Sequence, residues 1–209
     1  MSAAQWFLLA GFAVFIMVSA YMIARSLLGG GGGDLAVPKG RPAVLYSLTC
    51  AMLPWKKESA RLHAAVYLLG VGYHIGTFLS FFWMIALFFD ANLPAIAASA
   101  SAGLLGFTSV FGVVLALRRI TNSKLRYFSS PDDYFSNLVV TGFQALTLAV
   151  LLDRSLAPTL FVYGGILLLY IPVGKLRHAL YFASARFHLG LFYGRRGVWS
   201  VKGDRSWRQ

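Results

Sequence analysis

Five long stretches without a charged side chain constrain what this chain can fold into. They run over residues 5–24, 62–89, 91–117, 134–152 and 155–174. A helix needs about 20 apolar residues to cross a hydrocarbon core about 30 Å thick, and each stretch reaches or approaches that length. Only 12% of the residues are charged, whereas soluble domains carry about a quarter. The sequence therefore predicts an integral membrane protein.

The same stretches predict an all-α fold, a five-helix transmembrane bundle that forms a single membrane domain over residues 1–209. We expect helices over about residues 5–26, 60–89, 92–117, 134–153 and 157–190, followed by a basic tail at 195–209. The first is long for the apolar core of a signal peptide and has no preceding Lys or Arg, so we expect it to be retained. Short connections near residues 90 and 153 make the second and third helices, and the fourth and fifth, antiparallel neighbours.

Two local signals indicate where the fourth helix starts and how far the fifth helix extends. Ser129 or Ser130, followed by Pro131, Asp132 and Asp133, is typical of a helix N-terminus and predicts the start of the fourth helix. In the fifth helix, apolar periodicity continues past Pro172 toward residue 190. We therefore expect one long helix with a kink at this proline, whose inner end projects beyond the bilayer.

Basic residues gather on one side of the predicted membrane. Most lie in residues 39–61, 118–126 and 195–208, which the alternation of five helices puts on the same side. The turns on the other side hold Asp90, Asp153 and Arg154. The positive-inside rule then places the N-terminus outside and the C-terminus in the cytoplasm. Topology accounts for the formal net charge of +12, so the charge calls for no nucleic-acid partner.

All four histidines fall in the second and fifth helices. His63 and His74 are separated by 11 positions, close to three whole turns, so they share a face about 16 Å apart. His178 and His188 are separated by 10 positions, which gives about 15 Å in height and a rotation of about 80°. Counting ~1.5 Å per residue from the outer ends, His74 matches His178 in depth and His63 matches His188. Two facing imidazole pairs at two heights are what two stacked b-type haems require.

The single cysteine, Cys50, limits the redox chemistry that this chain can hold by itself. It allows no intrachain disulfide, no Cys-x-x-Cys-His haem attachment and no iron–sulfur cluster ligated by this chain alone. The predicted haems are therefore bound without a covalent link.

Residues near the histidines fit the same interpretation. Small side chains that let a flat macrocycle approach the helix lie at Ala64, Gly70, Gly72 and Gly76. Basic residues within reach of haem propionates are Arg61, Lys175, Arg177 and Arg186. Both features also have ordinary explanations, because glycine is common in membrane helices and basic residues are expected at inner helix ends.

The segments LHAAVYLLGVGYHIG and YIPVGKLRH resemble the second-helix and fifth-helix motifs of the gamma subunit of respiratory nitrate reductases and its relatives. The resemblance covers most of the chain and implies two haem b groups. It assigns His63 and His188 to the inner haem, and His74 and His178 to the outer haem. The closer fifth-helix histidines and the following GLFYGRRGVW are more similar to membrane cytochromes of heterodisulfide-reductase-like complexes, so the terminal acceptor stays open.

This resemblance implies the quinone-reactive electron-transfer subunit of a respiratory oxidoreductase complex in the prokaryotic cytoplasmic membrane. Quinone would meet the outer haem, and an iron–sulfur subunit, nitrate-reductase-like or heterodisulfide-reductase-like, would dock on the cytoplasmic face. Polar candidates for the quinone site are Tyr73, Asp90 and Gln144. The basic tail from Arg195 onward is a candidate docking surface, and its alternative is contact with membrane lipid.

Two rival interpretations remain for a membrane chain with intramembrane histidines. One is a haem-free transporter or channel whose histidines relay protons, and the other is a purely structural anchor subunit. Transporter folds commonly carry inverted repeats and broken helices, and the sequence predicts neither.

Overall fold

The computed structural model describes residues 1–28, 43–56, 60 and 62–199, and every regular element within these ranges is helical. The long helices are α1 (Ala3–Leu28), α4 (Ala64–Phe88), α5 (Ala95–Thr121), α7 (Pro131–Leu152), α8 (Ala157–Tyr170) and α9 (His178–Arg195). The short ones are α2 (Val44–Leu48), α6 (Ser123–Tyr127) and the 3-10 turns η1 (Cys50–Met52), η2 (Pro54–Lys56), η3 (Arg154–Leu156) and η4 (Lys175–Arg177). The all-α prediction is confirmed.

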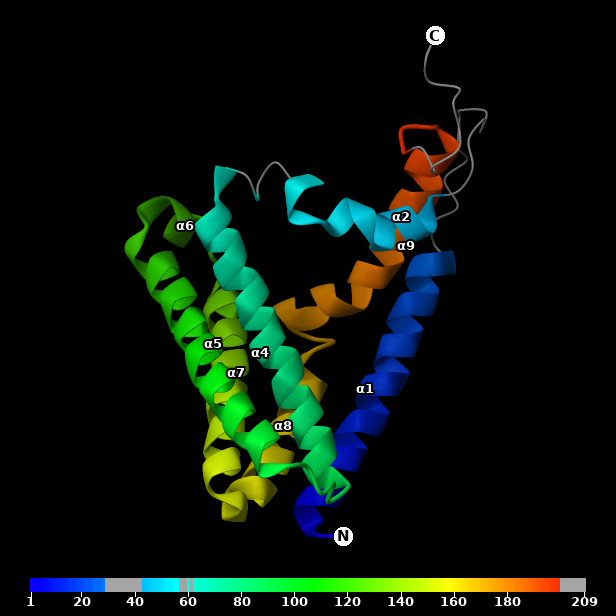
Figure 1. Ribbon diagram of the computed structural model, residues 1–209. Helices are drawn as coiled ribbons and strands as arrows, with labels where there is room; N and C mark the ends of the chain where they lie inside the picture. Colours follow the sequence, from blue (N-terminus) through cyan, green and yellow to red (C-terminus); the bar gives the residue numbers. More distant parts are fainter. Residues whose placement is uncertain (29–42, 57–59, 61, 200–209) are drawn as a thin grey trace. The chain divides into compact units, whose positions relative to one another are not determined.

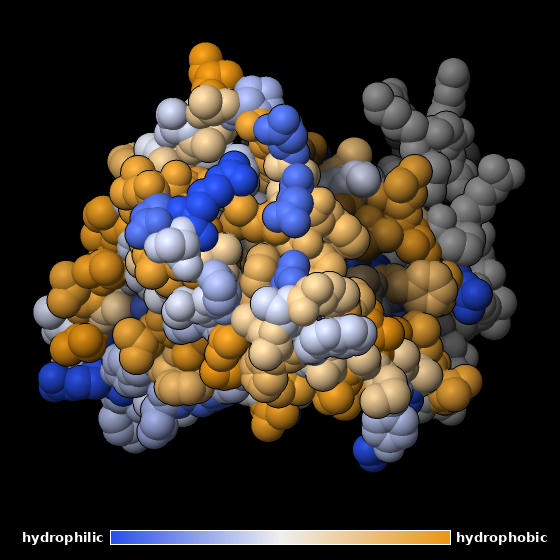
Figure 2. Space-filling model, turned by 90° about the horizontal axis from the view of Figure 1, so that it is seen from below, coloured by the Kyte–Doolittle hydropathy of each residue, from blue (hydrophilic) through white to orange (hydrophobic). Residues whose placement is uncertain are grey.

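Four helices, α1, α4, α5 and α7, are long and apolar enough to cross a membrane, and α8 with α9 makes a fifth span if the broken pair counts as one (Figure 1). Apolar side chains cover much of the surface seen from below (Figure 2). Exposed apolar residues on this scale suit contact with lipid, because a water-soluble surface rarely carries apolar patches of such extent. Within the described residues, the protein is all-helical and has four to five helices that could span a membrane.

The helix is interrupted near Pro172, where a kink is predicted, but the prediction of one continuous fifth helix over 157–190 is wrong. α8 ends at Tyr170 and α9 begins only at His178. Pro172 has no N–H to continue the ladder, and the N–H groups of Val173 and Gly174 both donate to the Tyr170 carbonyl, at 3.0 and 2.9 Å. The chain therefore turns between the two helices. The depths counted from Pro158 to His178 and His188 along a continuous helix do not hold.

The described contacts group the chain into two compact units. The first comprises Met1–Met17 with Ala65–Leu176, and the second comprises Val18–Ala64 with Arg177–Gln209.

Hydrogen bonds set the directions of the helices in the first unit. Tyr73 and Thr77 of α4 meet Thr141 and Gln144 of α7, so these two helices run parallel. Thr108 of α5 also meets Gln144, and α5 runs opposite to both, as the positions of its contacts show. The bonds from Tyr163 and Tyr170 to α7 make α8 antiparallel to α7. Both expected antiparallel pairs, α4 with α5 and α7 with α8, are confirmed.

Small residues let the helices of the first unit approach closely. A Cβ on Gly76 would lie 2.5 Å from Gln144 Oε1, and one on Gly11 would lie 3.0 Å from the Gly165 carbonyl oxygen. Among the described residues, Trp83, Phe143 and Leu105 are the largest fully buried side chains. Close approach of this kind drives helix association in lipid, where apolar burial alone gives little.

Helix ends in the first unit follow their local signals. Ser130 caps α7, since its N–H and its hydroxyl both donate to Asp133 Oδ2, at 2.9 and 3.0 Å, and Pro131 opens the helix. The predicted start of the fourth helix is confirmed.

The C-terminal end of α4 is closed by a residue in the left-handed region. Asp90 adopts a φ of 48°, and the Ala91 N–H donates to the Ala86 carbonyl at 2.9 Å. This left-handed residue closes the helix.

The second unit is built around α9. α2 lies across it (Figure 1), and the Ala43 N–H donates to the Gly190 carbonyl at 3.0 Å. A Cβ on Gly190 would lie 2.5 Å from Val44 Cα, so the two backbones are nearly in contact. Ser26 of α1 shares a 2.8 Å hydrogen bond with Ser184 of α9.

We expect Gly76→Ala to lower stability and Gly103→Ala to leave it unchanged or raise it. The first Cβ would press on Thr108 and Gln144, whereas nothing lies within 4 Å of the second. Overpacking costs about 1–3 kcal/mol, and a helical Gly→Ala change without a clash gains up to about 1 kcal/mol. The measurement is Tm in detergent. Equal Tm values for the two variants would contradict the packing of α4 on α5 and α7.

Candidate functional site

His74 is held in one tautomer on an exposed face of α4. Its Nδ1 lies 2.7 Å from the Gly70 carbonyl oxygen, one turn earlier in the helix. A carbonyl oxygen only accepts hydrogen bonds, so Nδ1 carries the proton and Nε2 of the neutral ring keeps its lone pair. Metal-binding histidines are commonly oriented in this way, by a backbone carbonyl on the nitrogen that does not bind the metal.

His188 has a buried ring nitrogen without a hydrogen-bond partner. Its Nε2 is shielded from solvent, and no donor or acceptor among the described residues reaches it. In the same unit, Ser19 Oγ and Ser47 Oγ are also buried without described partners. A buried polar atom left unpaired costs about 1–3 kcal/mol, so such an atom in a native protein points to a missing partner. An imidazole lone pair facing a metal ion would remove this cost.

The other two histidines lie at helix starts. His63 is exposed in the turn before α4, and His178 is the exposed first residue of α9. His63, His178 and His188 belong to the second unit, whereas His74 belongs to the first. Within the described ranges, no group of three or more His, Cys, Asp or Glu side chains converges to hold a metal ion. Haem ligation asks for two axial imidazoles, so the pairing of these histidines stays a prediction.

The small residues of α4 have two different roles. Gly72 packs against the ring of Phe111 and Gly76 against Thr108, so both serve contacts with α5. Gly70, by contrast, has nothing within 4 Å of the place a Cβ would take. It lies one turn from His74 on the same side of the helix. Of the three predicted glycines on α4, Gly70 is thus the one that leaves room for a flat group beside a histidine.

Two of the three predicted quinone-site residues meet in a buried polar network. The Tyr73 hydroxyl donates to the Asn137 carbonyl at 3.0 Å and shares a 2.9 Å hydrogen bond with Thr141. Gln144, which is 0% exposed, donates to the Tyr73 carbonyl at 2.9 Å and accepts from Thr108 at 2.9 Å. These groups satisfy one another and tie α4, α5 and α7 together.

Asp90 does not join this network. It is exposed and closes α4, 17 positions from Tyr73 along the chain, or about 25 Å along the helix. The structure thus brings Tyr73 and Gln144 together and leaves Asp90 at the end of the helix.

Two of the four basic residues predicted to face haem propionates have other described partners. Lys175 forms a 2.6 Å ion pair with Asp133, and Arg186 lies 5.8 Å from the Phe182 ring centroid. Arg177 is exposed at the N-terminus of α9. Arg61 lies outside the described residues.

The start of the basic tail packs within the second unit. Trp199 contacts the rings of Tyr46 and Tyr193, with centroids 5.6 and 5.0 Å away, and Arg196 lies over Phe192. The predicted docking tail beyond residue 199 lies outside the described residues.

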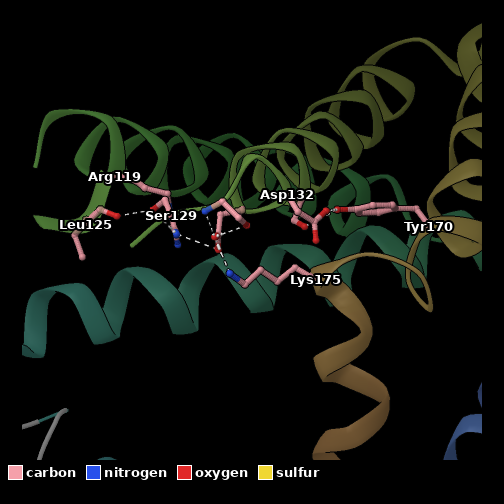
Figure 3. Close-up of polar contacts among 9 residues, drawn as sticks. Arg119, Leu125, Ser129, Asp132, Tyr170 and Lys175 are labelled. Carbon is pink, nitrogen blue, oxygen red and sulfur yellow. Dashed lines mark hydrogen bonds and ion pairs between the residues drawn. The ribbon is translucent and has the colours of Figure 1, made fainter. Parts of the chain in front are cut away.

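Sequence reasoning missed a charged cluster at one end of the first unit. Asp133 is 7% exposed at its side chain and is paired with both Arg119 and Lys175, at 3.0 and 2.6 Å (Figure 3). The Tyr170 hydroxyl donates to the neighbouring Asp132. The two aspartates were recognisable as a helix start, but their partners lie on other elements and gave no local signal.

No family model, curated protein or solved structure matches this chain.

We expect Gln144→Leu to lower Tm, because it leaves the hydroxyl groups of Thr108 and Thr77 without their partner amide. Interhelical hydrogen bonds in membranes contribute about 0.6 kcal/mol on average, up to about 1.7 kcal/mol. Thr121→Val, which removes an exposed hydroxyl bonded within its own helix, is the matched control. A Gln144→Leu protein as stable as this control would contradict a structural role.

Proposed function

We propose that this protein is a di-haem b membrane cytochrome, the subunit that carries electrons between membrane quinone and a cytoplasmic iron–sulfur partner. The observation that carries the proposal is the buried, unpaired Nε2 of His188. The tautomer of His74 supports it, since this ring presents its free nitrogen away from the helix backbone. Both rings thus offer the donor atom that haem iron takes.

Haem would supply the one-electron chemistry. The contribution of the chain is to present the imidazoles. Gly70 fixes the ring of His74 through its carbonyl, and its missing side chain leaves space beside that ring. The Nε2 atom of His188 is shielded from solvent, although the residue as a whole is only half-buried.

The proposal keeps the pairs His63 with His188 and His74 with His178. Along α9 alone, His178 and His188 are still separated by about 15 Å, so one helix would serve two haems at two heights. Which of His63 and His74 pairs with each histidine of α9 is part of the proposal, and spectra of single-histidine variants decide it.

The charge distribution supports a cytoplasmic partner at one end of the first unit. Arg119 and Lys175 lie at that end, while Asp90 and Asp153 end the parallel helices α4 and α7 at the other. By the positive-inside rule the basic end is cytoplasmic. We propose that the iron–sulfur subunit docks there, with quinone meeting the opposite haem.

A haem-free transporter is the second candidate, because the break between α8 and α9 is a feature that the sequence did not predict. Transporters use broken helices to build ion sites at the bilayer midplane. Here the residues on either side of the break are bound to acidic side chains of α7.

A reduced-minus-oxidised visible spectrum separates the two candidates. We expect a b-type band and about two haems per purified chain by pyridine haemochrome assay. A protein that is folded, judged by its thermal transition, but shows no b-type band would exclude the cytochrome and favour the transporter.

Single histidine variants test the pairing. We expect His63→Ala and His188→Ala to remove one and the same haem, and His74→Ala and His178→Ala to remove the other, because each haem loses an axial ligand. Spectra and potentiometric titration of each variant identify the haem that is lost. Loss of the same component from His63→Ala and His178→Ala would show that the pairing is wrong.

Gly70→Leu tests the space beside His74. We expect it to lower the content of the haem that His74→Ala removes, because a branched side chain would fill the open side of the helix. Gly103→Leu, at another helical glycine with nothing within 4 Å, is the matched control. Equal haem content in both variants would argue against a flat group at Gly70.

A further inference from the structure

One segment of the second unit, the α2–η2 segment (Val44–Lys56), buries one side and exposes apolar side chains on another. Val44 lies against the backbone of α9, and Ser47, one turn later on the same side of α2, is fully buried. Leu45 and Leu48 lie on the adjoining side of α2 and are 75% and 41% exposed, and Trp55 of η2 is 64% exposed. Large apolar side chains gathered in this way mark an interaction surface.

The segment lies close to the end of a membrane span. α1 ends at Leu28, and Ser26 in its last turn shares a 2.8 Å hydrogen bond with Ser184 of α9. Gly190, whose carbonyl accepts the Ala43 N–H at 3.0 Å, is six positions farther along α9, or about 9 Å. The headgroup layer on each side of a hydrocarbon core is about 5–8 Å thick. α2, which begins directly after Ala43, is therefore at about the depth of the lipid headgroups.

Amphipathic aromatic side chains join α2 to the end of α9. The Trp199 ring contacts the rings of Tyr46 in α2 and Tyr193 in α9, with centroids 5.6 and 5.0 Å away. The turn that carries Trp199 is closed by Gly197 at a φ of 71°, and the N–H groups of Val198 and Trp199 both donate to the Tyr193 carbonyl. Trp and Tyr are enriched at membrane–water interfaces, because one edge of each ring is apolar and the other bonds water.

The described part of the second unit carries basic but no acidic side chains. Exposed basic residues there are Arg25, Lys56, Arg177 and Arg195. The unit as a whole also holds most of the 19 Lys and Arg residues of the chain. Lys56 directly follows the exposed Trp55, so positive charge and apolar surface lie side by side. This combination is attracted to the negative surface potential of a membrane that contains anionic lipid.

We propose that the α2–η2 segment is a docking surface for anionic phospholipid. Leu45, Leu48 and Trp55 insert at the boundary between headgroups and acyl chains, and Lys56 lies among the lipid phosphates. Lipid is favoured over a protein partner because a segment so close to the end of a membrane span meets headgroups first, and their charge complements its own. The inference goes beyond haem ligation and does not rest on it.

The single cysteine provides the test. Cys50 lies in η1, within the α2–η2 segment, and is exposed, so a spin label attached to it reports the depth of the segment. The full chain is placed in nanodiscs of phosphatidylcholine with increasing fractions of phosphatidylglycerol. Power-saturation EPR measures collisions of the label with a water-soluble nickel complex and with oxygen, which concentrates in lipid. We expect phosphatidylglycerol to lower nickel accessibility at least about threefold, and high salt to reverse the change.

Two variants separate the contributions of charge and apolar surface. We expect Lys56→Gln to weaken the apparent affinity for phosphatidylglycerol about fivefold, because each basic residue near the surface adds to the attraction. Lys124→Gln, which removes an exposed lysine of α6 in the first unit, is the matched control and should leave the affinity unchanged. Leu45→Gln should lower the oxygen accessibility of the label, and Lys56→Gln serves if this variant does not fold.

Three outcomes would overturn the proposal. A label equally accessible to the nickel complex with and without phosphatidylglycerol, and water-exposed in both, would leave this surface to a protein partner. Equal protection in both kinds of disc would show that insertion does not depend on anionic lipid. The same loss of affinity in Lys56→Gln and Lys124→Gln would show an effect of net charge rather than docking at this segment. None of these readouts depends on haem, so a failure of the proposed function would leave the test intact.

Discussion

The hydrocarbon core of a membrane offers no water to bond a backbone N–H or C=O, and this constraint governs the whole protein. Each backbone group must find its partner inside the chain, which leaves helices as the only regular structure for apolar segments of this length. The same constraint makes an interruption costly. At the break between α8 and α9, the N–H groups of Val173 and Gly174 turn back to the Tyr170 carbonyl, and side chains of α7 hold the residues on either side.

Buried polar side chains in the helices also need hydrogen-bond partners, so a buried polar atom without one stands out. Gln144, Thr108 and Tyr73 satisfy one another and join three helices. The Nε2 atom of His188 is buried and has no described partner. Four other buried atoms are likewise without a described partner, namely Trp83 Nε1 and Ser109 Oγ in the first unit and Ser19 Oγ and Ser47 Oγ in the second.

The candidate site shows how much of its arrangement can be predicted from residue type alone. Tyr73 and Gln144 were singled out as intramembrane polar residues, and they do meet, but in a network that is complete without a ligand. Lys175 was predicted to face a propionate because it precedes a histidine, and its partner is Asp133, 42 residues earlier. Gly72 and Gly76 were assigned to a haem, and they pack against α5. In each instance the sequence identified an unusual residue without indicating which helix it faces.

Features that depend on residues close together in the chain could be predicted from the sequence. The all-helical class, the apolar spans and the start of α7 at Ser130 and Pro131 follow from hydrophobic length and capping chemistry within a few positions. The other features depend on contacts between segments that are distant in the chain. The end of α8 at Tyr170, the contacts of Tyr170 and Lys175 with α7, and the open space beside Gly70 depend on which faces of distant helices meet. In lipid, hydrophobicity does not select which helix faces meet, because an apolar face is equally stable against lipid and against another helix. Packing of small residues and hydrogen bonds between polar residues make the selection.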